Sequence, residues 1–296
     1  MSDSTRFEFE VRNKFFEANR RIVESEICPA HTVSFAVEVD LTEVERVRAR
    51  APGPRKPSYT AFVVKAVALA LKEFPYANRR VCRRVLAGHR LQRFHHRDVA
   101  VAIERDISGS EATAFLDIIR DADEMPLSQV TERLRELAVC DVTTNKQWAE
   151  FSKVIRGLPC WLSALLIRLP WLVPGLWDKW RGGSVLISSP AKYGVDAVIG
   201  TWPHPLGVSF GLAKPRPVVR DGEVVACPTF TLTLSFDRRI MAGAQSARFF
   251  HRIIEALERA ETELATVAAS AAVPVPMGAR ATAASQGVAA AGVLAS

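Results

Sequence analysis

The stretch Thr229-Phe-Thr-Leu-Thr-Leu-Ser-Phe-Asp-Arg-Arg-Ile-Met-Ala-Gly243 decides the fold of this chain. From Thr229 to Phe236, hydroxyl-bearing and apolar side chains alternate, which is the two-residue period of a strand with one face in the core. Asp237 to Gly243 then form a loop. After this loop the apolar side chains recur at helical spacing, at Ala247, Phe250, Ile254 and Leu257. The pattern predicts a strand, a loop and a helix in direct succession.

Further elements are predicted on the N-terminal side of this unit. They are an amphipathic helix over Arg12–Glu26, a half-buried strand over Thr32–Val39, a helix from its N-cap Ser58 to about Phe74, a central strand over Val99–Ile103, a helix from about Ser128 that ends before Thr143, strands over 184–189 and 207–213, and a hairpin that turns at Asp221-Gly222. No internal repeat is visible in the sequence.

Five short motifs follow one another along the chain. They are Val37-Glu38-Val39-Asp40-Leu41-Thr42, Ser58-Tyr59-Thr60-Ala61-Phe62 with Lys65, Ile119-Arg120-Asp121-Ala122-Asp123, Gly182-Gly183-Ser184 leading to Tyr193-Gly194-Val195-Asp196, and the loop Asp237–Gly243. With these motifs the chain resembles, from about Arg20 to Ala260, the catalytic domain of the acyltransferase component of 2-oxoacid dehydrogenase complexes, a relative of chloramphenicol acetyltransferase. The resemblance implies an α/β fold (two-layer α+β), with a mixed β-sheet and packed helices.

The resemblance also implies roles for the loop, whose family pattern is Asp-His-Arg-x-x-Asp-Gly. In the family the histidine is the general base that takes the proton of a coenzyme A or dihydrolipoamide thiol, and the thiolate then attacks the acyl thioester. The second aspartate helps to hold the site together. A hydroxyl on an upstream strand stabilises the oxyanion, and the alignment puts this hydroxyl on Ser188.

Two of these positions are changed in this chain. Arg238 stands at the histidine position and Ala242 at the second aspartate, whereas Asp237, Arg239 and Gly243 are retained. A guanidinium stays protonated and has no acceptor lone pair, so Arg238 cannot act as the base. Loss of a positioned base costs about a hundredfold to ten-thousandfold in rate. We therefore expect weak or altered acyl transfer.

Other histidines are weaker candidates for the missing base. His204 follows Pro203 in a loop that the family also places near the active site, but a histidine packed between prolines is the preferred interpretation. His251 lies on the helix after the motif and is a still weaker candidate. His95 and His96 have no metal-ligand partners at useful spacing, and we interpret them as surface residues.

Two interpretations of Arg238 remain open. Its guanidinium can bind a phosphate or carboxylate through two parallel hydrogen bonds, which would turn the reaction centre into an anion site. Alternatively, selection on this position has lapsed. Coenzyme A or acyl-coenzyme A is the ligand that the resemblance implies, with no metal and no covalently attached lipoyl group.

An apolar insert over residues 148–181 departs from the common family pattern. Its centre, 157–177, holds three of the six tryptophans of the chain. Pro159, Arg168, Pro170 and Pro174 interrupt it, so it lacks the run of about 20 apolar residues that a membrane span needs. We expect it to pack against the core or a neighbouring subunit. A contact with a membrane surface, or a cover over an acyl chain, is the alternative.

The composition places the chain in a broad class. With 296 residues, 48% of them hydrophobic, it can bury a full core, and we assign residues 1–264 to one catalytic-type domain. Residues 265–296 are rich in Ala and few are charged, which predicts a disordered tail. The net charge of +7 favours anionic partners, but the arginines are scattered, so no nucleic-acid site is expected.

The sequence also leads to expectations about the cellular compartment and the partners of the protein. The five cysteines include no Cys-x-x-Cys pair, and the N-terminus has no apolar signal region, so a reduced, cytoplasmic protein is expected. No lipoyl domain is recognisable before Arg20, so the domain would be free-standing, and a separate lipoyl-bearing or acyl carrier protein would have to deliver acyl groups. The resemblance alone implies a homotrimer in which Ser188 of one subunit faces Arg238 of the next. A non-catalytic acyl-coenzyme A-binding or assembly subunit is the alternative function.

Overall fold

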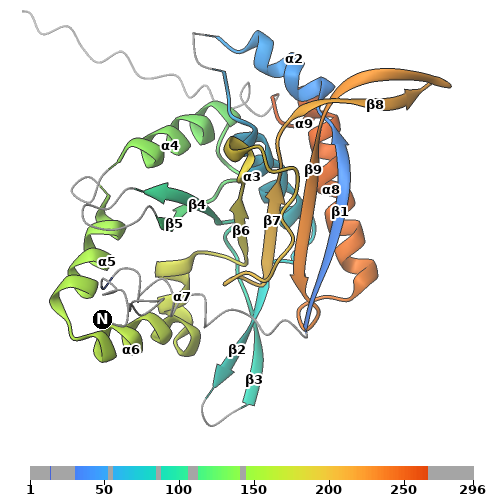
Figure 1. Ribbon diagram of the computed structural model, residues 1–296. Coiled ribbons are helices and arrows are strands. Elements are labelled where there is room, and N and C mark those ends of the chain that lie inside the picture. The colour runs from blue at the N-terminus through green and yellow to red at the C-terminus, as the bar shows by residue number, and fades with distance from the viewer. Residues whose placement is uncertain are drawn as a thin grey trace, which may run out of the picture.

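A computed structural model describes residues 14, 31–52, 56–84, 88–105, 113–140 and 145–265. Its main sheet has the strand order β1-β9-β7-β6-β4-β5, with β8 paired to β9 (Figure 1). The strands are β1 (Thr32–Asp40), β4 (Val99–Arg105), β5 (Thr113–Ile119), β6 (Val185–Ser188), β7 (Leu206–Phe210), β8 (Lys214–Arg220) and β9 (Glu223–Asp237). The β4–β6 and β6–β7 pairs are parallel, and the other pairs are antiparallel. The sheet is therefore mixed, as expected.

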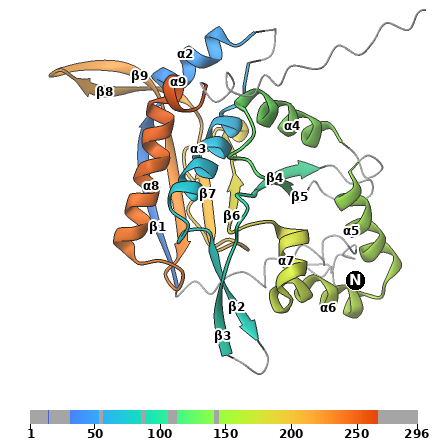
Figure 2. The ribbon, with the colours of Figure 1, turned by 180° about the vertical axis from the view of Figure 1, so that it is seen from behind.

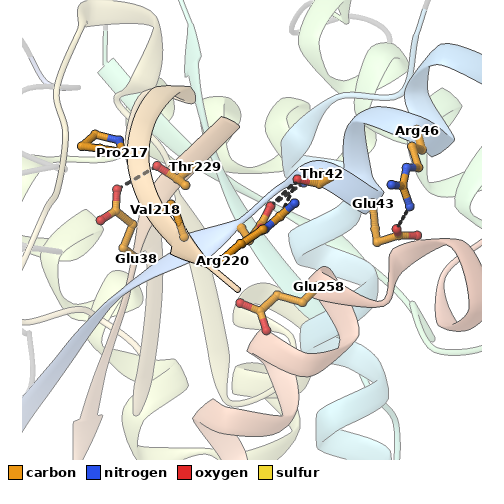
Figure 3. Close-up of a pocket in the computed structure, with 10 residues that line it drawn as sticks. Glu38, Thr42, Glu43, Arg46, Pro217, Val218, Arg220, Thr229 and Glu258 are labelled. Carbon is orange, nitrogen blue, oxygen red and sulfur yellow. Dashed lines mark hydrogen bonds and ion pairs between the residues drawn. The ribbon is translucent and has the colours of Figure 1, made fainter. Parts of the chain in front are cut away.

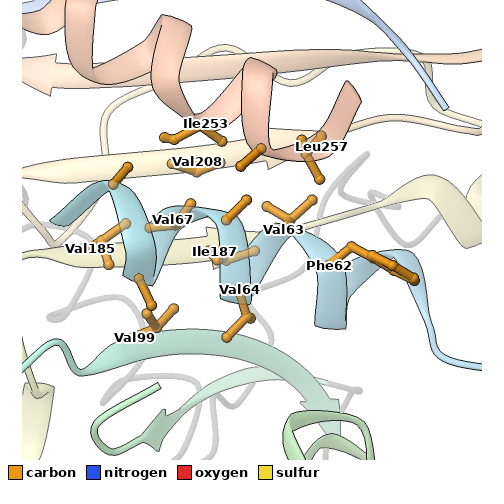
Figure 4. Packing of buried hydrophobic residues seen from close by; sticks show 14 of the residues in the cluster. Phe62, Val63, Val64, Val67, Val99, Val185, Ile187, Val208, Ile253 and Leu257 are labelled. Atoms are coloured by element: carbon orange, nitrogen blue, oxygen red, sulfur yellow. The ribbon is translucent and has the colours of Figure 1, made fainter. Parts of the chain in front are cut away.

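Helices cover one face of this sheet. The helix α3 (Tyr59–Glu73) packs beside α8 (Gly243–Glu258), with α4 (Leu127–Val139) on its other flank (Figure 2). The short helices α2 (Thr42–Arg50) and α9 (Ala260–Glu263) lie at one end of α8. Figure 4 shows α3 side chains such as Val63 and Val67 between the strands and α8 residues such as Ile253. This apolar layer is the core of the molecule.

Strand alternation assigns each side chain to one face of the sheet. Phe230, Leu232, Leu234 and Phe236 of β9 belong to the core beneath the helices. The Thr and Ser residues between them therefore point to the opposite face. There the Thr233 hydroxyl donates a 2.7 Å hydrogen bond to the carbonyl of Val198, in the segment between β6 and β7. A loop thus covers the hydroxyl-rich face.

The apolar insert folds as three helices. They are α5 (Lys146–Gly157), α6 (Cys160–Leu172) and α7 (Pro174–Arg181), and they lie at the β4–β5 end of the sheet (Figure 1). Trp177 is fully buried, whereas Trp161 and Leu165 of α6 are exposed. The insert thus packs on its own domain through one side and leaves apolar groups on the other. None of the described helices is long and apolar enough to cross a bilayer.

The structure confirms most of the predicted elements. Ser58 caps α3 through a 3.3 Å hydrogen bond from the Ala61 amide, and the β8–β9 hairpin turns at Asp221-Gly222 with positive φ at both residues. The elements that were missed include the helix α2, the strand β5 and the hairpin formed by β2 (Arg79–Arg84) and β3 (Gly88–Arg93). β2 and β3 are rich in arginine and project as a two-stranded ribbon (Figure 1), so they lack the apolar alternation of a core strand.

Some expectations concern residues outside the part of the chain that the structure describes. The predicted helix over 12–26 and the tail over 265–296 lie outside the described residues, apart from Lys14 and Ala265. Among the cysteines that the structure describes, Cys82, Cys140 and Cys227 are free thiols.

Candidate functional site

The loop after β9 is held by its first and third residues. The Asp237 carboxylate, 2% exposed, accepts the Arg239 amide at 2.9 Å and pairs with its guanidinium at 2.7 Å. The Asp237 amide donates to the carbonyl of Pro205 at 2.9 Å, and the Ile240 amide returns to the Asp237 carbonyl at 3.0 Å. The retained aspartate and arginine therefore set the backbone of the turn.

Arg238 occupies the exposed tip of this turn. Its backbone amide donates a 2.8 Å hydrogen bond to the carbonyl of His31, the residue just before β1. His31 is itself exposed. The antiparallel pairing of β1 with β9, Thr32 opposite Asp237, brings this histidine beside the position where the family carries its base. Sequence reasoning missed His31 because this neighbour is 207 residues away along the chain.

Ala242 stands at the N-cap of α8, and its backbone has the extended conformation of a cap (φ −78°, ψ 164°). An alanine has no side-chain acceptor, so no side chain at this position accepts from the first helical amides. The Gln245 side chain instead accepts the Ala242 amide at 3.0 Å. The exposed Gly243 begins the helix. The N-terminus of α8 therefore has no side-chain cap at Ala242.

Ser188 is the last residue of β6 and lies on the face away from α3 and α8. Within the described residues its hydroxyl has no hydrogen-bond partner from the protein. Its lateral neighbour on β7 is Ser209, and the neighbour beyond that on β9 is Thr233. The hydroxyl is thus available to a ligand on that face.

Ser188 and Arg238 do not meet within one chain. Thr233, which is level with Ser188, lies two strands away from it and four residues before Asp237. With about 3.4 Å per residue and about 4.8 Å between strands, the Cα atoms of Ser188 and Asp237 are roughly 16 Å apart. A single reaction centre cannot contain both side chains of the same subunit.

His204 is enclosed in the protein. It is 1% exposed, its Nε2 lies 2.9 Å from the carbonyl of Arg181, and its ring packs against Trp177. Burial lowers the pKa of His204 to about 3, and the nearby Arg181 and Arg80 guanidinium groups lower it further. A neutral imidazole is therefore held between a carbonyl and an indole, which favours a structural role.

The remaining histidines contact carboxylates at the surface. His251 lies 3.6 Å from Glu255 on the same helix, and His96 Nδ1 lies 2.8 Å from Asp121. The hydrogen bond to Asp121 raises the pKa of His96. Across the described ranges, no cluster of three metal-ligating side chains occurs.

Two of the sequence motifs meet around one buried lysine. The Lys65 ammonium, fully buried in α3, donates to the carbonyls of Ala122, Asp123 and Met125 at 3.3, 2.6 and 2.6 Å. Arg97 pairs with the Asp123 carboxylate at 2.8 Å. The second and third motifs are therefore parts of one scaffold, and they hold the turn after β5 against α3.

An apolar cavity of about 380 Å³ lies between the insert and the sheet. Ala102 of β4, Leu116 of β5, and Leu186 and Ser188 of β6 line it from the sheet side. The insert helices line the other side, and Trp202 closes it from the loop between β6 and β7. The sequence pointed to both the insert and Ser188 but did not predict that they line one cavity. Strand alternation alone does not say which segment covers a face of the sheet.

A second pocket, of about 680 Å³, is polar and lies at the far end of β9 from Arg238 (Figure 3). Most of its charges are paired: Arg220 with Asp40, Arg46 with Glu43, and Glu38 with Arg216 at 3.0 Å. Asp40 also accepts the amide and hydroxyl of Thr42 at 2.8 and 2.6 Å. The first sequence motif therefore builds the junction between β1 and α2, and this pocket contains none of the expected site residues.

Comparison with known families gives one match. The family described as 2-oxoacid dehydrogenases acyltransferase (catalytic domain) matches residues 16–151 and 177–265. Residues 152–176 fall between the two matched parts and contain all of α6.

Two curated relatives are bacterial. The dihydrolipoyllysine-residue acetyltransferase component of the pyruvate dehydrogenase complex of Rhizobium meliloti is 28% identical over 249 residues, which cover 80% of this chain and 47% of the relative. The component of the same name from Bacillus subtilis is 24% identical, with 82% and 49% covered. The chain thus spans about half the length of the curated relatives it matches.

Solved structures share the fold. A probable dihydrolipoamide acetyltransferase from Listeria monocytogenes has a TM-score of 0.60 at 22% identity and covers 86% of this chain and 94% of its own. A dihydrolipoamide acetyltransferase from Azotobacter vinelandii also has a TM-score of 0.60 at 22% identity, with 87% and 94% covered. A serine, a histidine and an asparagine have roles in the catalytic mechanism of that enzyme. The expected chloramphenicol acetyltransferase-like fold is confirmed.

Proposed function

Because the chain belongs to the family of 2-oxoacid dehydrogenase acyltransferase catalytic domains, we propose that it binds coenzyme A thioesters and transfers their acyl group only weakly or in an altered way. In this reaction a thiol loses its proton, its sulfur attacks the thioester carbonyl, and the tetrahedral intermediate expels the coenzyme A thiolate. Ser188, whose hydroxyl is unpaired within the described residues, is the proposed donor to the oxyanion.

The proposal of low activity rests on Arg238, which stands where the family has its general base. In the Azotobacter vinelandii enzyme, the histidine and asparagine named for catalysis are four residues apart, which is also the spacing of Arg238 and Ala242. Asp237 and Arg239 retain the turn that would present a base, but Arg238 has no lone pair to accept a proton. Residual transfer would then depend on binding and proximity.

A homotrimer is part of the proposal. The roughly 16 Å between Ser188 and Asp237 within one chain supports a site shared by two subunits, because the two groups must lie within a few ångström of one acyl carbon. The coenzyme A channel would then run along the subunit boundary, with Arg238 at its side.

The restored motif tests this function. Formation of coenzyme A from acetyl-coenzyme A and dihydrolipoamide, followed by chromatography because thioester exchange leaves the number of free thiols unchanged, should become at least about a hundredfold faster when Arg238→His and Ala242→Asp are combined. Arg248→His, a change at an exposed arginine of α8, is the matched control and should leave turnover unchanged. Native turnover equal to that of the double variant would refute the loss of the base.

The second candidate is a binding or assembly subunit without catalysis. The exposed position of Arg238 and its fixed charge favour it, because a guanidinium can hold a phosphate or carboxylate where a base once acted. Coenzyme A binding without turnover, in both the native protein and the restored double variant, would support this candidate over the first.

A further inference from the structure

The cavity between the insert and the sheet has features that acyl transfer does not require. One wall of it comes from residues outside the family match, among them Leu166, Leu169 and Pro170 of α6. Apolar atoms dominate its surface. The insert therefore gives this chain an apolar chamber built on the common fold.

One cation lines this chamber without a counter-charge. Arg181, the last residue of α7, is 6% exposed, and across the described residues its guanidinium has neither an ion pair nor a hydrogen bond. Arg105, which also lines the chamber, differs: it pairs with Asp117 and donates to the carbonyl of Cys140 at 2.6 Å. Of these two arginines, only Arg181 has a free charge.

A buried, unpaired guanidinium is costly, because water no longer solvates the charge and no carboxylate replaces it. Burial lowers the pKa of Arg181 to about 10, so the group still carries its charge at neutral pH. The carbonyl groups at the end of α7 offset at most about half a unit charge. The chamber therefore has mainly apolar walls and one positive charge without a counter-charge.

We propose that this chamber binds an apolar carboxylic acid, whose carboxylate pairs with Arg181 and whose hydrocarbon part lies against α6 and the sheet. A carboxylate supplies two acceptors for the planar guanidinium fork, and a hydrocarbon part suits the apolar walls. The chamber also contains Ser188, the proposed oxyanion donor, but the pairing of a carboxylate with Arg181 requires neither Arg238 nor coenzyme A.

The size of the chamber indicates the size of the ligand. An apolar cavity of about 150 Å³ is enough to hold benzene, so about 380 Å³ accepts a longer hydrocarbon group. Octanoate is a suitable probe, with octan-1-ol as the same chain without charge and acetate as the same charge without a chain. Trp148, Trp180 and Trp202 line the chamber, so their fluorescence reports an occupant.

Titration calorimetry and tryptophan emission test the native protein first. Octanoate should bind with one site per chain and raise the thermal midpoint, and both octan-1-ol and acetate should bind at least about tenfold more weakly, since each lacks one half of the recognition. Equal affinity for octanoate and octan-1-ol would overturn the role of the charge. Absence of octanoate binding would overturn the site itself.

Two variants locate the ligand. Arg181→Met keeps the length of the side chain and should weaken octanoate binding at least about tenfold without weakening that of octan-1-ol. Leu166→Trp should fill the chamber and weaken both ligands. Leu165→Trp is the matched control, because Leu165, the neighbour of Leu166 on α6, is exposed and does not line the chamber. Unchanged octanoate affinity in folded Arg181→Met, or equal effects of the two tryptophan variants, would contradict the assignment.

Coenzyme A binding by the same proteins separates this site from the proposed function. Native protein that binds octanoate but not coenzyme A would retain the chamber and refute the coenzyme A site. Native protein that binds coenzyme A but not octanoate would do the reverse.

Discussion

At the scale of single residues, Arg238 is the position at which we propose that this chain departs from its family. Its neighbours Asp237 and Arg239 are bound to each other, so the turn keeps its shape whatever side chain occupies the tip. The chemistry of the tip can therefore change without a change of fold. This separation explains how a base can be lost while the surrounding strand, turn and helix persist.

The anion-site interpretation of Arg238 predicts a measurable binding effect. Arg238→Ala should weaken coenzyme A binding about threefold to fivefold at low salt, the size of an exposed ion pair, and the difference should shrink as salt is added. Equilibrium dialysis measures it, with Arg248→Ala as the control for loss of an exposed positive charge nearby. Unchanged affinity would favour lapsed selection at this position.

His204 predicts how stability depends on pH. Its folded-state pKa of about 3 lies below the ordinary value of 6.5, so the unfolded chain binds the proton more readily. The contribution of the neutral His204 to the free energy of unfolding is therefore complete above pH 6.5 and is lost as the pH falls from there towards 3. Urea unfolding at pH 7 and pH 5 should show about 2 kcal/mol less loss in His204→Gln than in the native protein. An identical loss in both would contradict the buried, neutral imidazole.

At the scale of elements, strand alternation explains what each part of the sheet does. The apolar residues of β9 build the core with α3 and α8, and its hydroxyls face the loop between β6 and β7. Gly207 of β7 is needed on that second face, because a Cβ there would lie 1.8 Å from the Trp202 ring. The indole can therefore approach the strand closely and line the chamber together with Ser188.

The N-terminus of α8 predicts a gain in stability from restoring an acidic residue. Ala242 already has cap backbone angles, so Ala242→Asp should stabilise the protein by about 0.5–2 kcal/mol by accepting a first-turn amide. Ala247→Asp, an exposed position further along α8, is the control and should show little or no gain. Urea unfolding measures both. A loss of stability in Ala242→Asp would mean that the carboxylate does not reach the helix amides.

At the scale of the whole molecule, the position of Ser188 relative to Arg238 predicts complementation between subunits. A subunit with Arg238→His, Ala242→Asp and Ser188→Ala carries a base but no hydroxyl, and the native subunit carries the reverse. Co-expressed and purified as a mixed oligomer, they should form coenzyme A from acetyl-coenzyme A and dihydrolipoamide at a rate that neither reaches alone. Sedimentation velocity should give a trimer. Mixed oligomers that remain as slow as the separate proteins would contradict a site shared between subunits.

Sequence patterns predicted the elements that have strong periodicity and left the others out. The residues Thr229–Phe236, Ser58–Phe74 and the turn at Asp221-Gly222 carry alternation, a cap and a turn dipeptide, and each is present in the structure. The arginine-rich β2–β3 ribbon has no such pattern and was missed. Contacts between distant segments, such as His31 with Arg238 and Lys65 with Ala122, could not be predicted from local periodicity.

The sequence by itself determined the family and the fold class, and it predicts two replaced positions in the loop, because all of these rest on residue identity and local spacing. Only the tertiary structure decided which groups share a space. It separated Ser188 from Arg238 within one chain, buried His204 against Trp177, and left Arg181 unpaired in an apolar chamber that also contains Ser188. The physical reason is that solvation and charge pairing depend on neighbours in space, and most of these neighbours are distant in sequence.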